Sequence, residues 1–173
     1  MVPEAPLEPA GKGRAPAGPG WFVLNARDAR WLSGPKFGAF TPFEHRERAR
    51  FEQIGFNIAK LGAGQPACYY HGEGDQEGFL VVDGEALLLI EGEERPLKKW
   101  DYVHCPPWAE HVILGAGDDG CVLIGVGARQ NRGVVYPASE LAQSHGAGVR
   151  ETTRDPREAY ADAPEDEEVE SVL

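Results

Sequence analysis

The sequence has few of the features that would place it in a membrane or in an oxidising compartment. No run of about 18 apolar residues occurs in its 173 residues, so we expect no membrane-spanning helix. The three cysteines, Cys68, Cys105 and Cys121, are an odd number at distant positions, which argues against a disulfide framework. Residues 1–20 lack the apolar stretch of a signal peptide. We therefore expect a cytoplasmic protein.

Positive charge is scarce as well. The chain has 17 lysines and arginines against 28 acidic residues, a net charge of −11, and it shows no basic stripe. Such a chain is a poor binder of nucleic acid. Residues 151–173 carry nine acidic and two basic side chains, and we expect a solvated, flexible tail there. A docking tail for a basic partner is the alternative.

Composition divides the chain into four parts. Residues 1–20 hold five prolines and four glycines and should form a disordered or extended arm. Residues 21–137 are expected to form a β-barrel, in which residues 40–51 are either a short helix or a charged loop. Residues 138–150 are a helical extension, because Ser139 can cap a helix that Gly146 ends. Residues 151–173 are the acidic tail.

The central region contains six short β-rich runs, at residues 66–71, 77–84, 85–97, 101–107, 111–120 and 121–129. Each is bounded by Gly, Pro or Asp, which is typical of an all-β sandwich or barrel. A hairpin is expected around Gly92. Residues 115–120, GAGDDG, match a dinucleotide-binding pattern, but a strand-like run follows them where that site needs a helix. We interpret them as a hairpin turn.

Ionisable residues gather at the start of one apolar run. If residues 69–73 are extended, His71 and Glu73 share one face, and Glu77 begins the next run. Burying such groups costs free energy unless they are paired or bind a metal. His111, which begins another run, is the candidate fourth group. Imidazole nitrogens with carboxylate oxygens suit Zn, Fe, Mn, Ni or Co and do not select among them. A metal-free hydrogen-bonded polar cluster is the alternative.

The spacing around these residues resembles the first motif of the cupin family. Five residues separate Gln65 from His71-x-Glu73, three lie between Glu73 and Glu77, and six lie between Glu77 and Gly84. The family motif has glycine where Gln65 stands and a second histidine where Glu73 stands. The region of resemblance is residues 62–127.

The second cupin motif is matched in the same way. Five residues separate Trp100 from Pro106-x-Trp108, and two more precede His111. Both tryptophans stand where the family has glycine. The resemblance implies an all-β, cupin-type double-stranded β-helix, or jelly-roll barrel, with a short C-terminal helix and flexible tails. It also implies a homodimer, for which residues 21–32 could supply an exchanged edge.

The resemblance implies a metal site of His71, Glu73, Glu77 and His111. The protein would then be a metal-dependent enzyme, of oxygenase or isomerase type, with a divalent ion (Zn, Fe, Mn or Ni) and a small oxygenated metabolite as ligand. Glu73 is a candidate catalytic base, and Tyr69, which would share a face with His71, could bond the ligand. The alternative is a binding module without metal. A metal-bound Glu73 would favour the enzyme, and an outward or salt-bridged Glu73 the binding module.

One of two neighbouring residues should face the barrel interior. His104 and Cys105 are adjacent on an expected strand, so their side chains point to opposite sides. The sequence does not decide which of them points inward.

Overall fold

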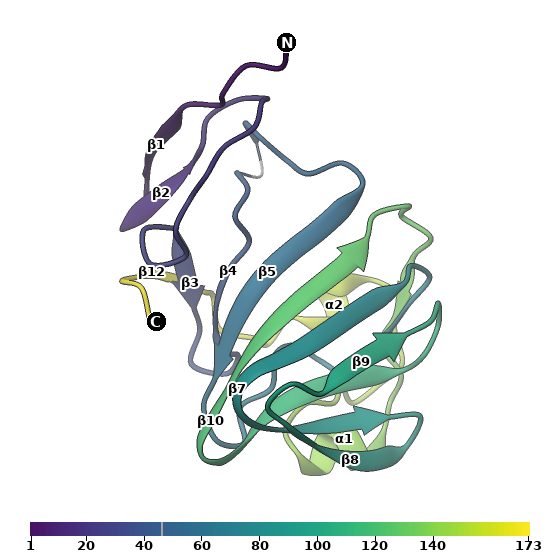
Figure 1. The fold of residues 1–173 in the computed structure, drawn as a ribbon. Helices are drawn as coiled ribbons and strands as arrows, with labels where there is room; N and C mark the ends of the chain where they lie inside the picture. Colours follow the sequence, from purple (N-terminus) through teal and green to yellow (C-terminus); the bar gives the residue numbers. More distant parts are fainter. Residues whose placement is uncertain (46) are drawn as a thin grey trace.

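Two long antiparallel strands, β7 (Glu77–Ile90) and β10 (His111–Ala128), form the centre of the fold. The structure is a computed structural model that describes residues 1–45 and 47–173. Strand β5 (Ile54–Leu61) pairs with the second half of β10, and Figure 1 shows β5, β10 and β7 side by side across the molecule. These strands carry the polar cluster at one of their ends.

The remaining strands extend this sheet on both sides. β8 (Glu93–Lys98) and β9 (Tyr102–Cys105) pair with the two halves of β7. Beyond β5 the order is β4 (Ala39–Thr41), β3 (Trp31–Ser33) and β12 (Glu167–Val169). Two small sheets pair β1 (Leu7–Ala10) with β2 (Gly13–Pro16) and β6 (Gly72–Glu73) with β11 (Val134–Val135). The all-β, jelly-roll prediction is confirmed.

The barrel interior is filled by alternate residues of these strands. Because successive strand residues point to opposite faces, every second apolar side chain packs inward. The buried core consists of Ala59, Leu61, Val81, Ala86, Leu88, Val103, Cys105, Ile113, Cys121 and Leu123. The intervening residues of β7 and β10 face outward or pack against the C-terminal segment.

Short helices follow the barrel. α1 (Glu140–Ser144) begins after Ser139, whose hydroxyl accepts a hydrogen bond from the Ala142 amide, and Gly146 follows with a positive φ. These are the cap and stop expected from the sequence. α2 (Pro156–Ala159) is a second short helix. Within the described ranges, no helix is long and apolar enough to cross a membrane.

The terminal segments are more ordered than their composition predicts. Residues 1–20 form the β1–β2 hairpin rather than a disordered arm, because Arg14 hydrogen-bonds the backbone at Asp28 and Arg30. The acidic tail adds β12 to the sheet beside β3, and the Glu168 carboxylate pairs with Arg30. Strand β3 therefore has a partner on each side, and residues 31–33 present no free edge for exchange with another chain.

One connection decides between two alternatives, and another corrects an expectation. The described residues of segment 40–51 contain no helix, which agrees with the charged loop and not with the short helix. Residues 115–120 are not a hairpin turn, because both halves of β10 pair with the same strand, with Ala116 opposite Glu85 and Cys121 opposite Gly84. They form a bulge within β10, and left-handed φ angles of 63° and 69° at Gly117 and Gly120 let the strand continue past it. The hairpin around Gly92 is confirmed.

The two tryptophans that replace motif glycines keep the backbone conformation that glycine favours. Trp100 has φ 77° and Trp108 has φ 71°, both in the left-handed region. Such a conformation costs a non-glycine residue about 1–2 kcal/mol. The chain therefore retains the bends that lead into β9 and β10 in spite of the substitutions.

Gly84 and Gly92 provide a matched test of the bend in β7. Both have positive φ, but a Cβ at Gly84 would lie 2.0 Å from the Gly120 carbonyl oxygen, whereas a Cβ at Gly92 meets nothing within 4 Å. We expect Gly92→Ala to cost about 1 kcal/mol of unfolding free energy and Gly84→Ala more than about 3 kcal/mol, measured by urea denaturation. Equal costs would contradict the close approach of β7 and β10 at Gly84.

Candidate metal centre

The backbone brings two histidines face to face. The His71 amide donates to the His111 carbonyl oxygen at 3.1 Å, and the His111 amide donates to the His71 carbonyl at 2.8 Å. Residues paired in this way project their side chains to the same face. The two imidazole ring centroids accordingly lie 5.0 Å apart, and both residues are buried.

The protonation of both rings is set by backbone carbonyls. Nδ1 of His71 lies 2.7 Å from the Tyr69 carbonyl oxygen, and Nδ1 of His111 lies 2.9 Å from that of Ala109. A carbonyl oxygen can only accept, so each Nδ1 carries a hydrogen. In the neutral rings both Nε2 atoms are therefore unprotonated, which is the arrangement that a carbonyl partner imposes on metal-binding histidines.

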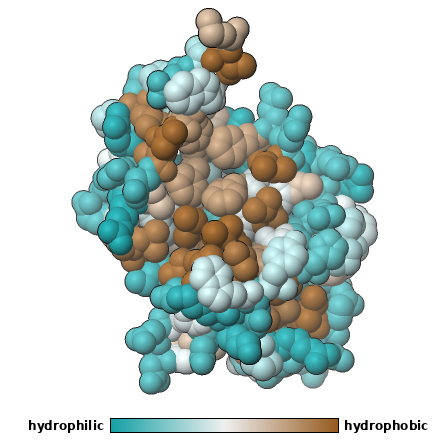
Figure 2. Space-filling model, in the orientation of Figure 1, coloured by the Kyte–Doolittle hydropathy of each residue, from teal (hydrophilic) through white to brown (hydrophobic). Residues whose placement is uncertain are grey.

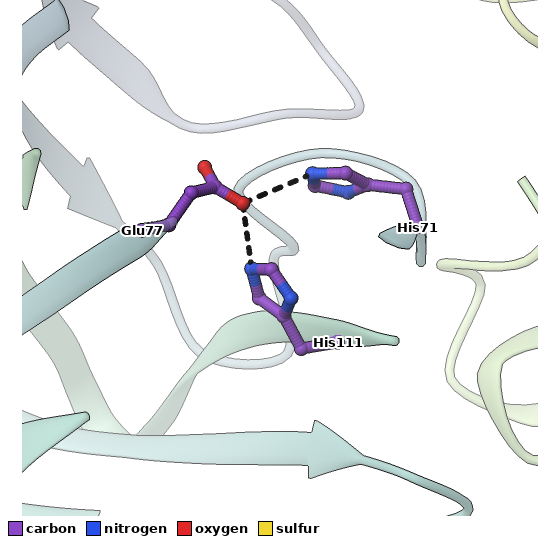
Figure 3. Close-up of side chains that lie close together, drawn as sticks. All are labelled: His71, Glu77 and His111. Carbon is purple, nitrogen blue, oxygen red and sulfur yellow. Dashed lines mark ion pairs between the residues drawn. The ribbon is translucent and has the colours of Figure 1, made fainter. Parts of the chain in front are cut away.

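Glu77 supplies the third group. It is the first residue of β7, and Figure 3 shows its carboxylate facing both imidazoles. One of its oxygens, Oε2, lies 3.3 Å from Nε2 of His111 and 3.7 Å from Nε2 of His71. The ligand atoms of His71, Glu77 and His111 all lie within 4.8 Å of one another. One cation could contact all three.

The donor set fits a divalent metal ion. Nε2 of His111 is buried and has no hydrogen-bond partner within the described part of the chain. Two nitrogen lone pairs and a carboxylate oxygen repel one another unless a positive charge lies between them. A metal ion or a proton can supply that charge. Two histidines and one carboxylate are also the ligands of mononuclear non-haem iron sites, and they suit other divalent ions.

In the metal-free protein, protons occupy this position. Burial lowers the pKa of His111, but the Cys105 thiol and the Glu77 carboxylate outweigh it and raise that pKa to about 10. Burial raises the pKa of Glu77, but its pairing with the protonated rings of His111 and His71, at 3.3 and 3.7 Å, lowers it to about 2. The pKa of His71 is raised too, by Cys68 and Glu77 against its burial.

Glu73 lies at the rim of this cluster. Its Oε1 is 4.0 Å from Nε2 of His71, and its side chain is 38% exposed. Burial and the nearby Glu77 charge raise the pKa of its carboxyl. Glu73 is thus not among the three tightly grouped ligand atoms, and its ion pair with His71 is the salt-bridged position that favours the binding module.

A cavity of about 400 Å³ adjoins the cluster at the barrel mouth. Its wall includes Glu73 and Glu77 on one side and Asn57 and Arg129 on the other. Gly127 stands opposite Glu77 in the sheet and leaves space beside the carboxylate, since a Cβ there would meet only Glu77, at 3.6 Å. The cluster therefore borders a space that a small molecule could enter.

The comparisons with known proteins agree with this geometry. Residues 57–127 match the family described as "Cupin domain". This part of the chain is a cupin domain. No relative was found among curated proteins.

Solved structures show the same fold at low identity. A predicted oxalate decarboxylase of Thermotoga maritima is 18% identical, with a TM-score of 0.54, over 62% of this chain and 99% of that one. A cupin-like protein of the same organism is 21% identical, with a TM-score of 0.52, over 68% and 88%. A proposed sugar phosphate isomerase of Acidithiobacillus ferrooxidans is 25% identical, with a TM-score of 0.44, over 48% of this chain. This cupin spans about half of that protein, 54%.

The structure does not bring the Tyr69 hydroxyl into the cluster. Residues 69 and 70 lie outside any regular strand, so the alternation assumed from the sequence does not apply there. The Tyr69 ring packs against Phe37 and Tyr160, and its hydroxyl accepts a hydrogen bond from Lys36 at 2.8 Å. Only its backbone carbonyl reaches His71.

Tyr136, which the sequence reasoning missed, takes the place beside His71. Its ring centroid lies 5.8 Å from the His71 ring, and its side chain is buried. No motif marks this residue. Its position follows from the pairing of β11 with β6. Val135 lies opposite Gly72, so the next residues along the two segments, Tyr136 and His71, come side by side.

The alternative between His104 and Cys105 is settled by burial. Cys105 is 1% exposed and lies in the barrel core, where its thiol is close enough to raise the pKa of His111. His104 is exposed on the outer face of β9. His104 therefore serves as a control residue for experiments on the cluster.

The pKa shifts predict how pH affects the metal-free protein. The raised pKa of His111 gives stability that is complete below pH 6.5 and is lost as pH rises through 10. The lowered pKa of Glu77 gives stability that is complete above pH 4.5 and is lost as pH falls through 2. The stability that Glu77 contributes should therefore be greatest between pH 4.5 and 6.5.

Urea denaturation of chelator-treated protein measures this effect. The difference in unfolding free energy between wild type and Glu77→Gln should shrink by on the order of 3 kcal/mol between pH 6.5 and 10. Glu94→Gln is the control, because Glu94 pairs with His145 on the surface, at 2.8 Å. This substitution should change the unfolding free energy by less than about 1 kcal/mol. A Glu77 effect that does not vary with pH would contradict the paired cluster.

Proposed function

We propose that this cupin binds one divalent metal ion through His71, Glu77 and His111. We further propose that it is a metal-dependent enzyme, of oxygenase or isomerase type, acting on a small oxygenated metabolite. The observation that carries the proposal is the convergence of two Nε2 atoms on one carboxylate oxygen, in rings whose Nδ1 atoms both face backbone carbonyls. A bound ion of this kind polarises a carbonyl or hydroxyl oxygen, or activates dioxygen.

The chain's own residues would prepare the site for that ion. The Tyr69 and Ala109 carbonyls hold the two imidazoles in one orientation and one tautomer. The Phe79 ring, 5.3 Å from the His111 ring, excludes water on one side. A metal ion held by His71, Glu77 and His111 alone would be free to bind a further ligand, as catalytic metal sites require.

Glu73 is the proposed general base. It lines the cavity beside the cluster, and an oxygen of its carboxylate lies 4.0 Å from Nε2 of His71. From this position it can accept a proton from a ligand that contacts the metal, which is the geometric condition for a base. The hydrogen bond to the ligand that was expected of Tyr69 loses its support, because that hydroxyl contacts Lys36 instead.

The second candidate is a metal-free binding cupin. The observation in its favour is that protonated imidazoles satisfy Glu77 without an ion, as the raised pKa of His111 indicates. In that case the cavity would hold an organic ligand, and Glu73 would act only as a hydrogen-bond acceptor.

Metal content separates the two candidates. We expect near-stoichiometric metal, measured by mass spectrometry, in protein purified without a metal-affinity tag or loaded with Fe, Mn, Ni or Zn. His111→Ala should reduce the bound metal at least ~10-fold, because it removes a ligand. His104→Ala, seven residues earlier and exposed, should leave it unchanged. Absence of metal in the wild type after loading would contradict the metalloenzyme proposal and favour the binding module.

A homodimer and a cytoplasmic location remain predictions. Since β3 has a partner on each side, residues 31 and 32 of the predicted 21–32 segment offer no edge to a second copy. Apolar side chains are exposed over β5, β10, β7 and β9 (Figure 2), and a groove there is lined by Ile54, Leu80, Tyr102, Ile124 and Val126. We propose this outer sheet face as the contact with a second copy.

Light scattering after gel filtration tests the dimer. Wild type should elute with twice the chain mass, and Ile54→Lys should be a monomer, because Ile54 is half exposed within the groove. Val23→Lys is the control, since Val23 is 80% exposed and does not line the groove. A monomeric wild type would exclude the dimer, and a dimeric Ile54→Lys would exclude this face.

A further inference from the structure

The cavity beside the metal cluster has a polar wall. Its side chains include no aromatic ring among the described residues, and its apolar ones are small, Ala128 and Val134. Gly55, Gly127 and Gly133 contribute backbone alone. A cavity of about 400 Å³ with such a wall is suited to a small polar molecule rather than to an apolar or aromatic one.

Charge narrows the class of ligand. Three carboxylates, Glu73, Asp75 and Glu77, line the cavity. Arg129 is the one cationic side chain among its described lining residues, and its charge is paired with that of Glu44. Its Nη1 and Nη2 atoms donate to both oxygens of Glu44, at 2.8 and 2.6 Å, and Nη1 also donates to the Phe51 carbonyl.

One carboxylate of the wall is neither a ligand of the cluster nor paired with a lysine or arginine of the described residues. Arg129 pairs with Glu44, and Arg132 lies 3.9 Å from Asp75. A divalent ion held by His71, Glu77 and His111 would compensate Glu77, so Glu73 is the carboxylate that a ligand in the cavity meets. The Glu73 charge would repel an anionic ligand at close range and in a partly buried site, where repulsion is little screened.

Hydrogen-bonding capacity points to the same class. The Glu73 carboxylate, 38% exposed, can only accept hydrogen bonds. The exposed amides of Asn57 and Asn131 can both donate and accept. Such a wall is matched by a ligand rich in hydroxyl groups, which both donate and accept, and is poorly matched by an oxyanion, which only accepts.

We propose that the ligand of this site is a neutral, hydroxyl-rich molecule, a polyol or sugar, and not an organic acid or a phosphate. This inference rests on the proposed function, because the metal would take one of the ligand's oxygens while Glu73, Asn57 and Asn131 take its other hydroxyls. Glu73 then determines specificity by its charge as well as accepting a proton.

A matched pair of probes tests the proposal. Xylitol and xylonate share a five-carbon hydroxylated chain and differ in that one end of xylonate is a carboxylate. Binding to the cobalt-loaded protein is followed by calorimetry and by the visible spectrum of the cobalt. Xylitol should bind at least tenfold more tightly than xylonate. Equal or tighter binding of xylonate, or binding of neither, would overturn the proposal.

Variants of the wall make the test specific to charge. Compared with wild type, Glu73→Gln should raise the affinity for xylonate at least tenfold. Asn57→Asp, at an exposed position, should lower the affinity for xylonate below that of wild type and leave the binding of xylitol intact. Glu93→Gln, an exposed acidic residue of β8, is the control and should change neither affinity. If neither wall variant changes the affinity for xylonate, the proposed role of charge is contradicted.

Failure of the metal site is distinguishable from failure of this inference. Protein that takes up no cobalt contradicts the proposed function. The same titration of that metal-free protein still decides the ligand class, because Glu73 lines the cavity with or without an ion and the preference for xylitol must persist. A preference for xylonate in the metal-free protein would overturn the inference there as well.

Discussion

The convergence of two imidazole nitrogens on one carboxylate oxygen is the constraint around which the barrel mouth is built. It arises from the backbone, because His71 and His111 exchange two hydrogen bonds and so project to one side. Carbonyls of residues two positions earlier, Tyr69 and Ala109, then orient both rings by the same contact to Nδ1. Glu77 closes the group from the first position of β7. None of the three can ionise independently of the others.

The rest of the fold keeps these segments in place. β7 and β10 pair along almost their whole length, so the start of β7 is held at the sheet end where Gly127 leaves space. Asp75 connects the loop between His71 and Glu77 to the segment that follows β10. Its Oδ2 accepts hydrogen bonds from the backbone amides of Gln130 and Asn131, both at 2.8 Å. The cluster and the cavity wall therefore form one framework, which suits a site that must hold a fixed geometry.

The sequence predicts the fold and the cluster for physical reasons that act locally. Short apolar runs separated by turn residues indicate strands, and the cupin spacing places His71, Glu77 and His111 together. Ser139 and Gly146 mark the limits of α1 because capping depends on neighbouring residues only. Trp100 and Trp108 show that the bends of the motif persist without glycine, because both residues adopt left-handed φ angles.

The sequence-based predictions that failed share one cause: they depend on contacts between distant parts of the chain. Tyr69 lies in a loop where strand alternation does not hold, and Tyr136 reaches His71 through a strand pairing that no local pattern reveals. Residues 115–120 look like a turn, but β7 pairs with the chain on both sides of them. Residues 1–20 gain their hairpin from contacts with residues 21–30, which composition does not express.

The most direct test of the central claim is nitrogen-15 NMR of the histidine rings in zinc-loaded protein. Long-range proton–nitrogen correlations report which ring nitrogen carries the hydrogen. The account predicts that His71 and His111 are both protonated at Nδ1 and bound to zinc through Nε2, while His104 remains free and exchanging. Protonation at Nε2 of either residue, or zinc bound through Nδ1, would contradict the arrangement on which the proposed function depends.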